Sequence, residues 1–176
     1  THPAISTGLK TSKFGVAFDE AVSLYNEAAQ MKGVVARGID CHIGSQLTEL
    51  KPLREAVTKI AGLVQQLNAQ GQQMTHVDVG GGLGIRYHRE QPPALAAYSQ
   101  AICEPLSEID ATLIVEPGRV LVGNAGVLLT SVLYRKRSAK KQWIIGDAGM
   151  NDLLRPALYD AHHEIVAVAP RSTRRE

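Results

Sequence analysis

Three short apolar runs, each ending in a polar or glycine-rich motif, constrain the fold of this 176-residue chain more than any other feature. They cover residues 34–43, 76–79 and 112–115, and apolar residues recur at helical spacing in the segments between them. Such alternation of strands and helices is typical of an α/β protein with a parallel sheet covered by helices. Because parallel strands end at the same edge of their sheet, we expect the three motifs to meet there.

The expected helices have recognisable ends. The first is predicted over residues 19–33, the second over residues 52–71, and the third starts at Pro92 and Pro93. An open doubly wound sheet and a barrel share this local pattern. Motifs at every strand end favour the barrel, so we predict a partial (β/α)8, or TIM-type, barrel.

The pattern changes after the third motif. Residues 120–134 are apolar and β-branched, and further strand-like runs cover residues 142–146 and 164–168. We therefore predict a domain boundary at this point, with residues 1–119 forming the partial barrel and residues 120–176 forming the start of a C-terminal β domain.

Composition and charge argue against several classes of function. The net charge is +2, and the basic residues of the Arg135–Arg137 and Lys140–Lys141 cluster have no interleaved aromatic residues. A solvated hairpin tip is expected there, and no nucleic-acid surface. No apolar run is long enough to cross a membrane, and the histidines lack metal-ligand spacing. Cys41 and Cys103 make no disulfide framework; Cys41 is expected to pack in a strand, and a reducing, cytoplasmic location is predicted.

The first two motifs offer a flat aromatic ring and bare backbone amides. In Gly38-Ile39-Asp40-Cys41-His42-Ile43-Gly44-Ser45-Gln46, an imidazole and a hydroxyl follow the strand. In Asp78-Val79-Gly80-Gly81-Gly82-Leu83-Gly84-Ile85, the glycines can cradle a phosphate. The spacing fits neither G-x-G-x-x-G nor a Walker motif. The alternatives to a binding role are that His42 only supports the fold and that the glycines only form a tight turn.

The third motif, Glu116-Pro117-Gly118-Arg119, places a carboxylate and a guanidinium three residues apart. An idle carboxylate at the end of an apolar strand is costly, and the guanidinium fork suits a phosphate or a carboxylate. The alternative is an ion pair that braces a turn. Together the three motifs suit a phosphorylated, nitrogen-containing aromatic cofactor.

In this order, the three motifs resemble those of the diaminopimelate decarboxylases, pyridoxal-phosphate enzymes of the alanine racemase-like barrel class. The block Asp147-Ala148-Gly149-Met150-Asn151-Asp152-Leu153-Leu154-Arg155-Pro156-Ala157-Leu158-Tyr159 is the most specific part of the resemblance, which runs from His2 to about Ala169. It implies decarboxylation of meso-2,6-diaminopimelate to L-lysine, the last step of lysine biosynthesis. It also implies a homodimer with a composite active site.

The resemblance also implies roles for single residues. His42 would stack on the pyridine ring as the catalytic residue, and Glu116 would keep the ring nitrogen protonated. Arg119, Arg155 and Tyr159 would bind the substrate. The cofactor-binding residues that it implies are His42, Ser45, Gly81, Gly82, Glu116, Pro117, Gly118 and Arg119.

The chain also departs from this family. It starts without Met, in mid-motif, and we interpret it as the central part of a longer protein. The family's lysine, which holds the cofactor as a Schiff base, is expected upstream, because Lys10 and Lys13 lie in a different motif. An acidic segment that a partner subunit supplies is expected downstream, and residues 172–176 do not match the family. The chain by itself is therefore expected to be inactive.

Three alternatives remain. The first is a related decarboxylase acting on arginine, ornithine or carboxynorspermidine, against which Arg155 argues, because a site that forms a diamine has less use for a distal guanidinium. The second is a non-catalytic homologue that keeps the binding shell without the lysine. The third is a truncated gene product with no activity of its own.

Overall fold

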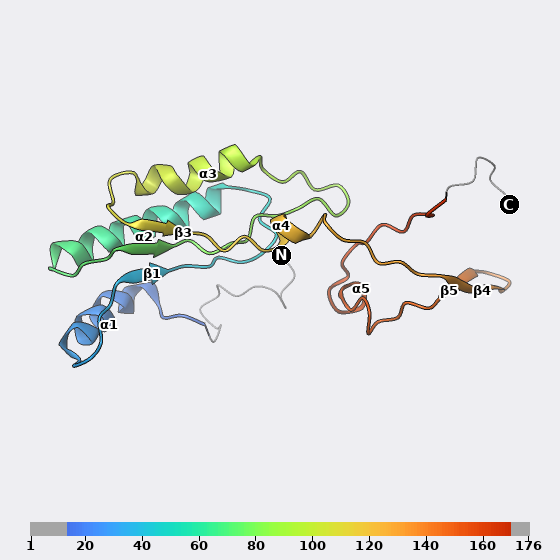
Figure 1. Cartoon of the computed structure of the whole chain (residues 1–176), viewed down its shortest axis with the longest axis horizontal. Coiled ribbons are helices and arrows are strands. Elements are labelled where there is room, and N and C mark those ends of the chain that lie inside the picture. The colour runs from blue at the N-terminus through green and yellow to red at the C-terminus, as the bar shows by residue number, and fades with distance from the viewer. Residues whose placement is uncertain (1–13, 170–176) are drawn as a thin grey trace. The chain divides into compact units, whose positions relative to one another are not determined.

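The computed structural model describes residues 14–169, which divide into two compact units (Figure 1). The first unit comprises the residues up to Ile85 together with Gln91–Ala125. The second comprises Arg86–Glu90 and the residues from Gly126 onward. The lysines at positions 10 and 13 lie outside the described residues. The expected boundary between barrel and β domain stays a prediction.

A parallel three-stranded sheet lies at the centre of the first unit. Its strands are β1 (Gly38–Asp40), β2 (His76–Asp78) and β3 (Thr112–Ile114), and they pair in the order β1-β2-β3. The predicted parallel pairing is confirmed, although each strand is shorter than its apolar run. The register aligns Ile39 with Val77, and Val77 with Leu113, in a row across the sheet.

One helix precedes the strands and others connect them, as the sequence pattern predicts. They are α1 (Phe18–Gln30), α2 (Lys51–Ala69), α3 (Leu95–Cys103) and the short 3-10 helix η2 (Glu104–Leu106). Pro52 lies in the first turn of α2, where its missing amide proton has no intrahelical partner to lose. After α2 the chain turns at Gly71, which has a φ of 88° that glycine adopts without steric cost.

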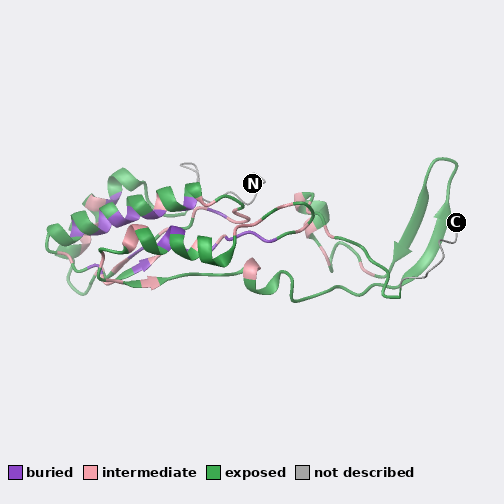
Figure 2. Cartoon of the chain, turned by 90° about the horizontal axis from the view of Figure 1, so that it is seen from above, coloured by how far each residue is buried: buried purple, intermediate pink, exposed green. Residues whose placement is uncertain are grey.

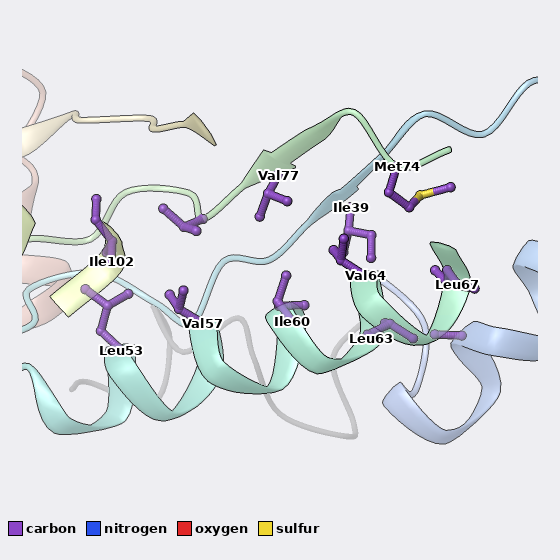
Figure 3. Packing of buried hydrophobic residues seen from close by; sticks show 12 residues of the cluster. Ile39, Leu53, Val57, Ile60, Leu63, Val64, Leu67, Met74, Val77 and Ile102 are labelled. Atoms are coloured by element: carbon purple, nitrogen blue, oxygen red, sulfur yellow. The ribbon is translucent and has the colours of Figure 1, made fainter. Parts of the chain in front are cut away.

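The core lies between these helices and one face of the sheet. Figure 3 shows side chains of α2 pointing toward Ile39 and Val77. The opposite face of the sheet is more open, since Asp40, His76 and Thr112 are exposed. The buried residues that α2 contributes are Leu53, Val57, Ile60, Ala61, Leu63, Val64 and Leu67.

Tyr25 links α1 to the first strand of the sheet by a hydrogen bond. Its hydroxyl donates a hydrogen bond to the carbonyl oxygen of Gly38 at 2.6 Å. Tyr25→Phe should lower the free energy of unfolding by about 0.5–1.5 kcal/mol, because the half-buried carbonyl loses its donor. Urea unfolding followed by circular dichroism measures this change. Tyr134→Phe, at an exposed position of the hairpin described below, is the matched control. An equal effect of both substitutions would contradict this role for Tyr25.

The same contact predicts a loss of stability at alkaline pH. Burial raises the pKa of Tyr25 above its ordinary value of 10.0, and the Asp40 carboxylate adds to the shift. The unfolded chain therefore ionises Tyr25 first, so this contribution is complete below pH 10 and is lost as the pH rises from there through the folded pKa. Tyr25→Phe should weaken this dependence. Tyr98, whose pKa is also raised by burial, should retain its own part.

The second unit contains an antiparallel hairpin of β4 (Val132–Arg137) and β5 (Gln142–Gly146). The predicted basic turn is confirmed, with the Ser138 amide donating to the carbonyl oxygen of Lys141 at 2.8 Å. Every residue of both strands is exposed (Figure 2). A five-residue helix, α5 (Arg155–Tyr159), follows.

One expected strand is confirmed only at its end, and another is wrong. Part of the 120–134 run forms the short helix α4 (Arg119–Val122), which closes with a hydrogen bond from the Gly123 amide to Arg119, and β4 begins only at Val132. Residues 164–168 form no strand, because no other described segment pairs with them. The composition of a segment does not show whether another segment is available to pair with it as a strand. None of the helices in the described part of the chain is both long and apolar enough to cross a membrane.

Candidate functional site

The three predicted motifs meet at one edge of the parallel sheet. Each loop that follows a strand is joined to the next by hydrogen bonds. The Gly81 amide donates to Nδ1 of His42 at 3.4 Å, and the Glu116 amide donates to the carbonyl oxygen of Gly80 at 2.8 Å. The Leu47 amide donates to the carbonyl oxygen of Gly82 at 2.8 Å. The predicted convergence of His42, Gly82 and Glu116 is therefore present within the first unit.

Close packing explains why glycines occupy the central loop. A Cβ atom on Gly81 would overlap the carbonyl oxygen of Glu116, and one on Gly82 would overlap that of Gly44. A Cβ atom on Gly80 would lie 2.8 Å from Nδ1 of His42. Gly80 and Gly82 also have φ angles of 67° and 101°, which side-chain-bearing residues rarely adopt. The glycines thus allow three loops to touch one another.

Several amides of the glycine loop already have acceptors inside the chain. The Gly80 amide donates to the Asp78 carboxylate at 2.8 Å, and the Gly84 amide to the carbonyl oxygen of Leu47 at 2.9 Å. Among the described residues, the amides of Gly82 and Gly118 have no such acceptor. The loop therefore offers fewer free donors to an anion than its four glycines suggest.

His42 is exposed, and its ring orientation is set by the loop beside it. Because Nδ1 accepts the Gly81 amide proton, the ring proton of the neutral imidazole lies on Nε2 in this arrangement. Ser45 is half-buried and follows Gly44, whose φ is 124°. The first motif therefore places an imidazole and a hydroxyl beside the glycine loop.

The third motif presents Glu116, Pro117 and Gly118 at the surface of this edge, while Arg119 is half-buried at the start of α4. Nη1 of Arg119 donates to Oε1 of Gln46 at 3.1 Å. Sequence reasoning quoted Gln46 as part of the first motif and assigned it no role.

Cys41 packs as the sequence predicted. It lies against the core, and burial raises the pKa of its thiol, with a further contribution from the Asp40 carboxylate. A raised pKa keeps the thiol neutral and unreactive. Both cysteines are free, as expected. Within residues 14–169 no group of histidine, cysteine or acidic side chains is arranged to hold a metal ion.

Arg155 and Tyr159 lie in the second unit, where the guanidinium of Arg155 lies near two aromatic rings. Cζ of Arg155 lies 5.6 Å from the ring centroid of Tyr87 and 5.6 Å from that of Tyr159. Tyr87 also contacts the ring of His163 edge-on, at 5.7 Å between centroids. Nε of Arg155 is buried and has no hydrogen-bond partner among the described residues. The sequence predicted no role for Tyr87, since it lies between the glycine motif and the third expected helix and belongs to neither.

Comparison with known proteins finds one family over most of the chain. Residues 1–123 match the family described as pyridoxal-dependent decarboxylase, pyridoxal binding domain. Diaminopimelate decarboxylase from Pseudomonas aeruginosa is 53% identical over 171 residues, which is 97% of this chain and 41% of that enzyme.

Solved structures agree with this similarity. Diaminopimelate decarboxylase from Helicobacter pylori, complexed with L-lysine, superposes with a TM-score of 0.93 and 44% identity over 98% of this chain and 43% of that one. Lysine/ornithine decarboxylase from Vibrio vulnificus, complexed with cadaverine, gives a TM-score of 0.81 at 23% identity over 91% of this chain and 44% of that one, and so shares the fold. The chain spans less than half the length of each of these relatives.

Proposed function

The chain belongs to the pyridoxal-dependent decarboxylases, and from this premise we propose that the protein decarboxylates meso-2,6-diaminopimelate to L-lysine. The 53% identity to the Pseudomonas aeruginosa diaminopimelate decarboxylase carries this proposal. The three loops that meet at the sheet edge support it, because they gather the side chains that such an enzyme needs around its cofactor.

The residues at this edge fit pyridoxal phosphate. The Gly82 amide, which has no acceptor among the described residues, and the hydroxyl of Ser45 would bind the phosphate. His42 would cover one face of the ring, and Glu116 would hold a proton on the ring nitrogen. When bound, pyridoxal phosphate supplies an electron sink for the carbanion that loss of CO2 creates.

The fold proposed for the first unit is a partial (β/α)8 barrel. Strands that are adjacent in sequence are adjacent in the sheet, without the reversal of order that a doubly wound sheet requires. The buried residues of the sheet face the helices, and the other face is open, as the inward face of an incomplete barrel would be. Residues 1–119 as the barrel portion, residues 120–176 as a β domain, the homodimer and the cytoplasmic location remain predictions.

Arg155 supports the choice of substrate. Diaminopimelate carries a second amino-acid group at its far end, and the carboxylate of that group needs a cationic partner. The guanidinium of Arg155 lies near the rings of Tyr87 and Tyr159, and its buried Nε lacks an acceptor within the described chain. An arginine or ornithine decarboxylase has less use for such a group. The Vibrio relative shares the fold at only 23% identity and does not favour that alternative.

Tyr87→Leu should raise KM for diaminopimelate by about two- to fivefold, because the guanidinium of Arg155 loses one of its two aromatic neighbours; this is a cation–π contribution of about 0.5–1 kcal/mol. The kcat should change little. Tyr87→Phe keeps the ring and should retain most of the affinity. Steady-state kinetics on the native protein measure both constants. An equal loss of affinity in Tyr87→Phe and Tyr87→Leu would show that the hydroxyl, and not the ring, is what matters.

The proposed function is tested by supplying the native protein with pyridoxal phosphate and meso-diaminopimelate, and measuring the CO2 and lysine formed. Arginine, ornithine and carboxynorspermidine are assayed in parallel. We expect equimolar CO2 and L-lysine from diaminopimelate alone. Preferred turnover of one of the other substrates would replace this assignment with that of a related decarboxylase. Cofactor binding without turnover of any substrate would favour a non-catalytic homologue.

A further inference from the structure

Gln46 adopts a backbone conformation that is unfavourable for its residue type. Its φ is 60°, and within residues 14–169 only one other non-glycine residue, Asp160, has a positive φ. A glycine would adopt this conformation without steric cost, whereas glutamine does so at the expense of folding free energy. The contacts of its side chain must therefore offset this strain.

The carboxamide of Gln46 pairs with both backbone polar groups of Ile85. Nε2 donates to the carbonyl oxygen of Ile85 at 2.5 Å, and the Ile85 amide donates to Oε1 at 3.2 Å. Ile85 is only 4% exposed, so without Gln46 these two groups would lose their partner in a place that water hardly reaches. The adjoining bridge between Leu47 and Leu83 brings the two segments into register.

The same oxygen accepts a hydrogen bond from Arg119. Nη1 of Arg119 lies 3.1 Å from Oε1 of Gln46, across 73 residues of sequence. Two donors, the Ile85 amide and the Arg119 guanidinium, thus converge on one carboxamide oxygen. Rotating the amide by 180° would present its NH2 group to both donors, so its orientation is fixed. Because Oε1 of Gln46 is fixed, it also fixes the position of Nη1 of Arg119.

From this arrangement we propose that Gln46 is a positioning residue, which orients Arg119 toward an anionic oxygen of the bound ligand. This rests on the proposed function. The chemistry that Arg119 would recognise is shared by the cofactor's phosphate and a substrate carboxylate. Gln46 acts only through Arg119 and touches neither ligand itself.

Two substitutions separate the side chain from the backbone. Gln46→Gly relieves the strained φ but removes the acceptor, and Gln46→Glu keeps an oxygen for Arg119 but loses the donor to Ile85. We expect Gln46→Gly to weaken ligand binding by about tenfold, the loss typical of one hydrogen bond to a charged group. Gln46→Glu should recover most of that loss, although it places a carboxylate against the Ile85 carbonyl and should unfold more easily. A purely structural role would instead make binding follow stability in both variants.

The measurements use the native protein. The Kd of pyridoxal phosphate, from absorbance titration, reports the phosphate, KM for diaminopimelate reports the carboxylate, and urea unfolding reports stability. In an Arg119→Ala background, Gln46→Gly should cause no further loss of binding. A change in either constant that vanishes in that background supports the role. An unchanged Kd and an unchanged KM in Gln46→Gly, or a loss that persists without Arg119, would overturn it. If no substrate is turned over, the proposed function fails, and the cofactor Kd alone decides the role of Gln46.

Discussion

Glu116→Gln in the native protein is expected to lower kcat for decarboxylation by about 100- to 1,000-fold, the usual effect of removing one preorganised electrostatic partner. Glutamine has the same shape as glutamate but no charge, so it cannot hold a proton on the ring nitrogen of the cofactor. The backbone of residue 116 should stay in place, because its amide bonds to Gly80 and its carbonyl packs against Gly81. The Kd of pyridoxal phosphate should therefore change much less than kcat.

Stopped assays of CO2 release give kcat, and absorbance titration gives the Kd of the cofactor. Glu108→Gln is the matched control, since Glu108 is an exposed carboxylate a few residues before β3. It should leave both constants unchanged. If Glu116→Gln weakens cofactor binding as much as it slows turnover, or changes neither constant, Glu116 only stabilises the loop.

The parallel sheet could be predicted because its signals are local. A strand is indicated by apolar residues at alternate positions or by a continuous β-branched run, and a helix by apolar residues at helical spacing. Where such segments alternate, they predict βαβ units without knowledge of distant contacts. The failures occurred where local pattern and tertiary context disagree. Residues 119–122 contain three β-type or apolar side chains, yet they form α4 between Gly118 and Gly123. Residues 164–168 have strand composition, but no other described segment pairs with them.

The candidate site likewise contains some features that the sequence predicts and others that it does not. The positions of His42, Gly82 and Glu116 could be predicted, because each follows a strand, and parallel strands bring their ends together. The contacts of Gln46 and Tyr87 could not, because they depend on how loops fold over long separations. One signal was available: a glutamine that directly follows the Gly-Ser pair of the first motif is long enough to reach a neighbouring loop.

The structure also changes the explanation for the glycines of the central loop. Sequence reasoning valued the glycines for their free amides, which could surround a phosphate. The structure shows that Gly81 and Gly82 are required first because Glu116 and Gly44 approach so closely. Of the central amides, that of Gly82 has no acceptor among the described residues, while those of Gly80 and Gly81 are bonded to Asp78 and His42. Gly82 therefore combines both features: its lack of a Cβ atom admits the Gly44 carbonyl, and its amide has no acceptor among the described residues.

Arg155→Ala should raise KM for diaminopimelate by about 10- to 150-fold, which corresponds to a charge-assisted contact of about 1.5–3 kcal/mol. The reason lies in the environment of the guanidinium. Its Nε atom is buried without an acceptor in the described chain, and the rings of Tyr87 and Tyr159 each lie 5.6 Å from its Cζ. A distal carboxylate would provide the missing acceptor. The kcat should fall less than the affinity, since this end of the substrate lies away from the bond that breaks.

Two further variants make this result specific. Arg155→Lys keeps the positive charge but loses the planar fork, so its KM should lie between those of the native protein and Arg155→Ala. Arg135→Ala removes an exposed charge from β4 and should leave KM unchanged. Because Arg155 also lies near two rings, thermal unfolding of each variant must show that the protein stays folded at the assay temperature. An unchanged KM in a folded Arg155→Ala variant would place the distal carboxylate elsewhere, and would favour a decarboxylase whose substrate has no such group.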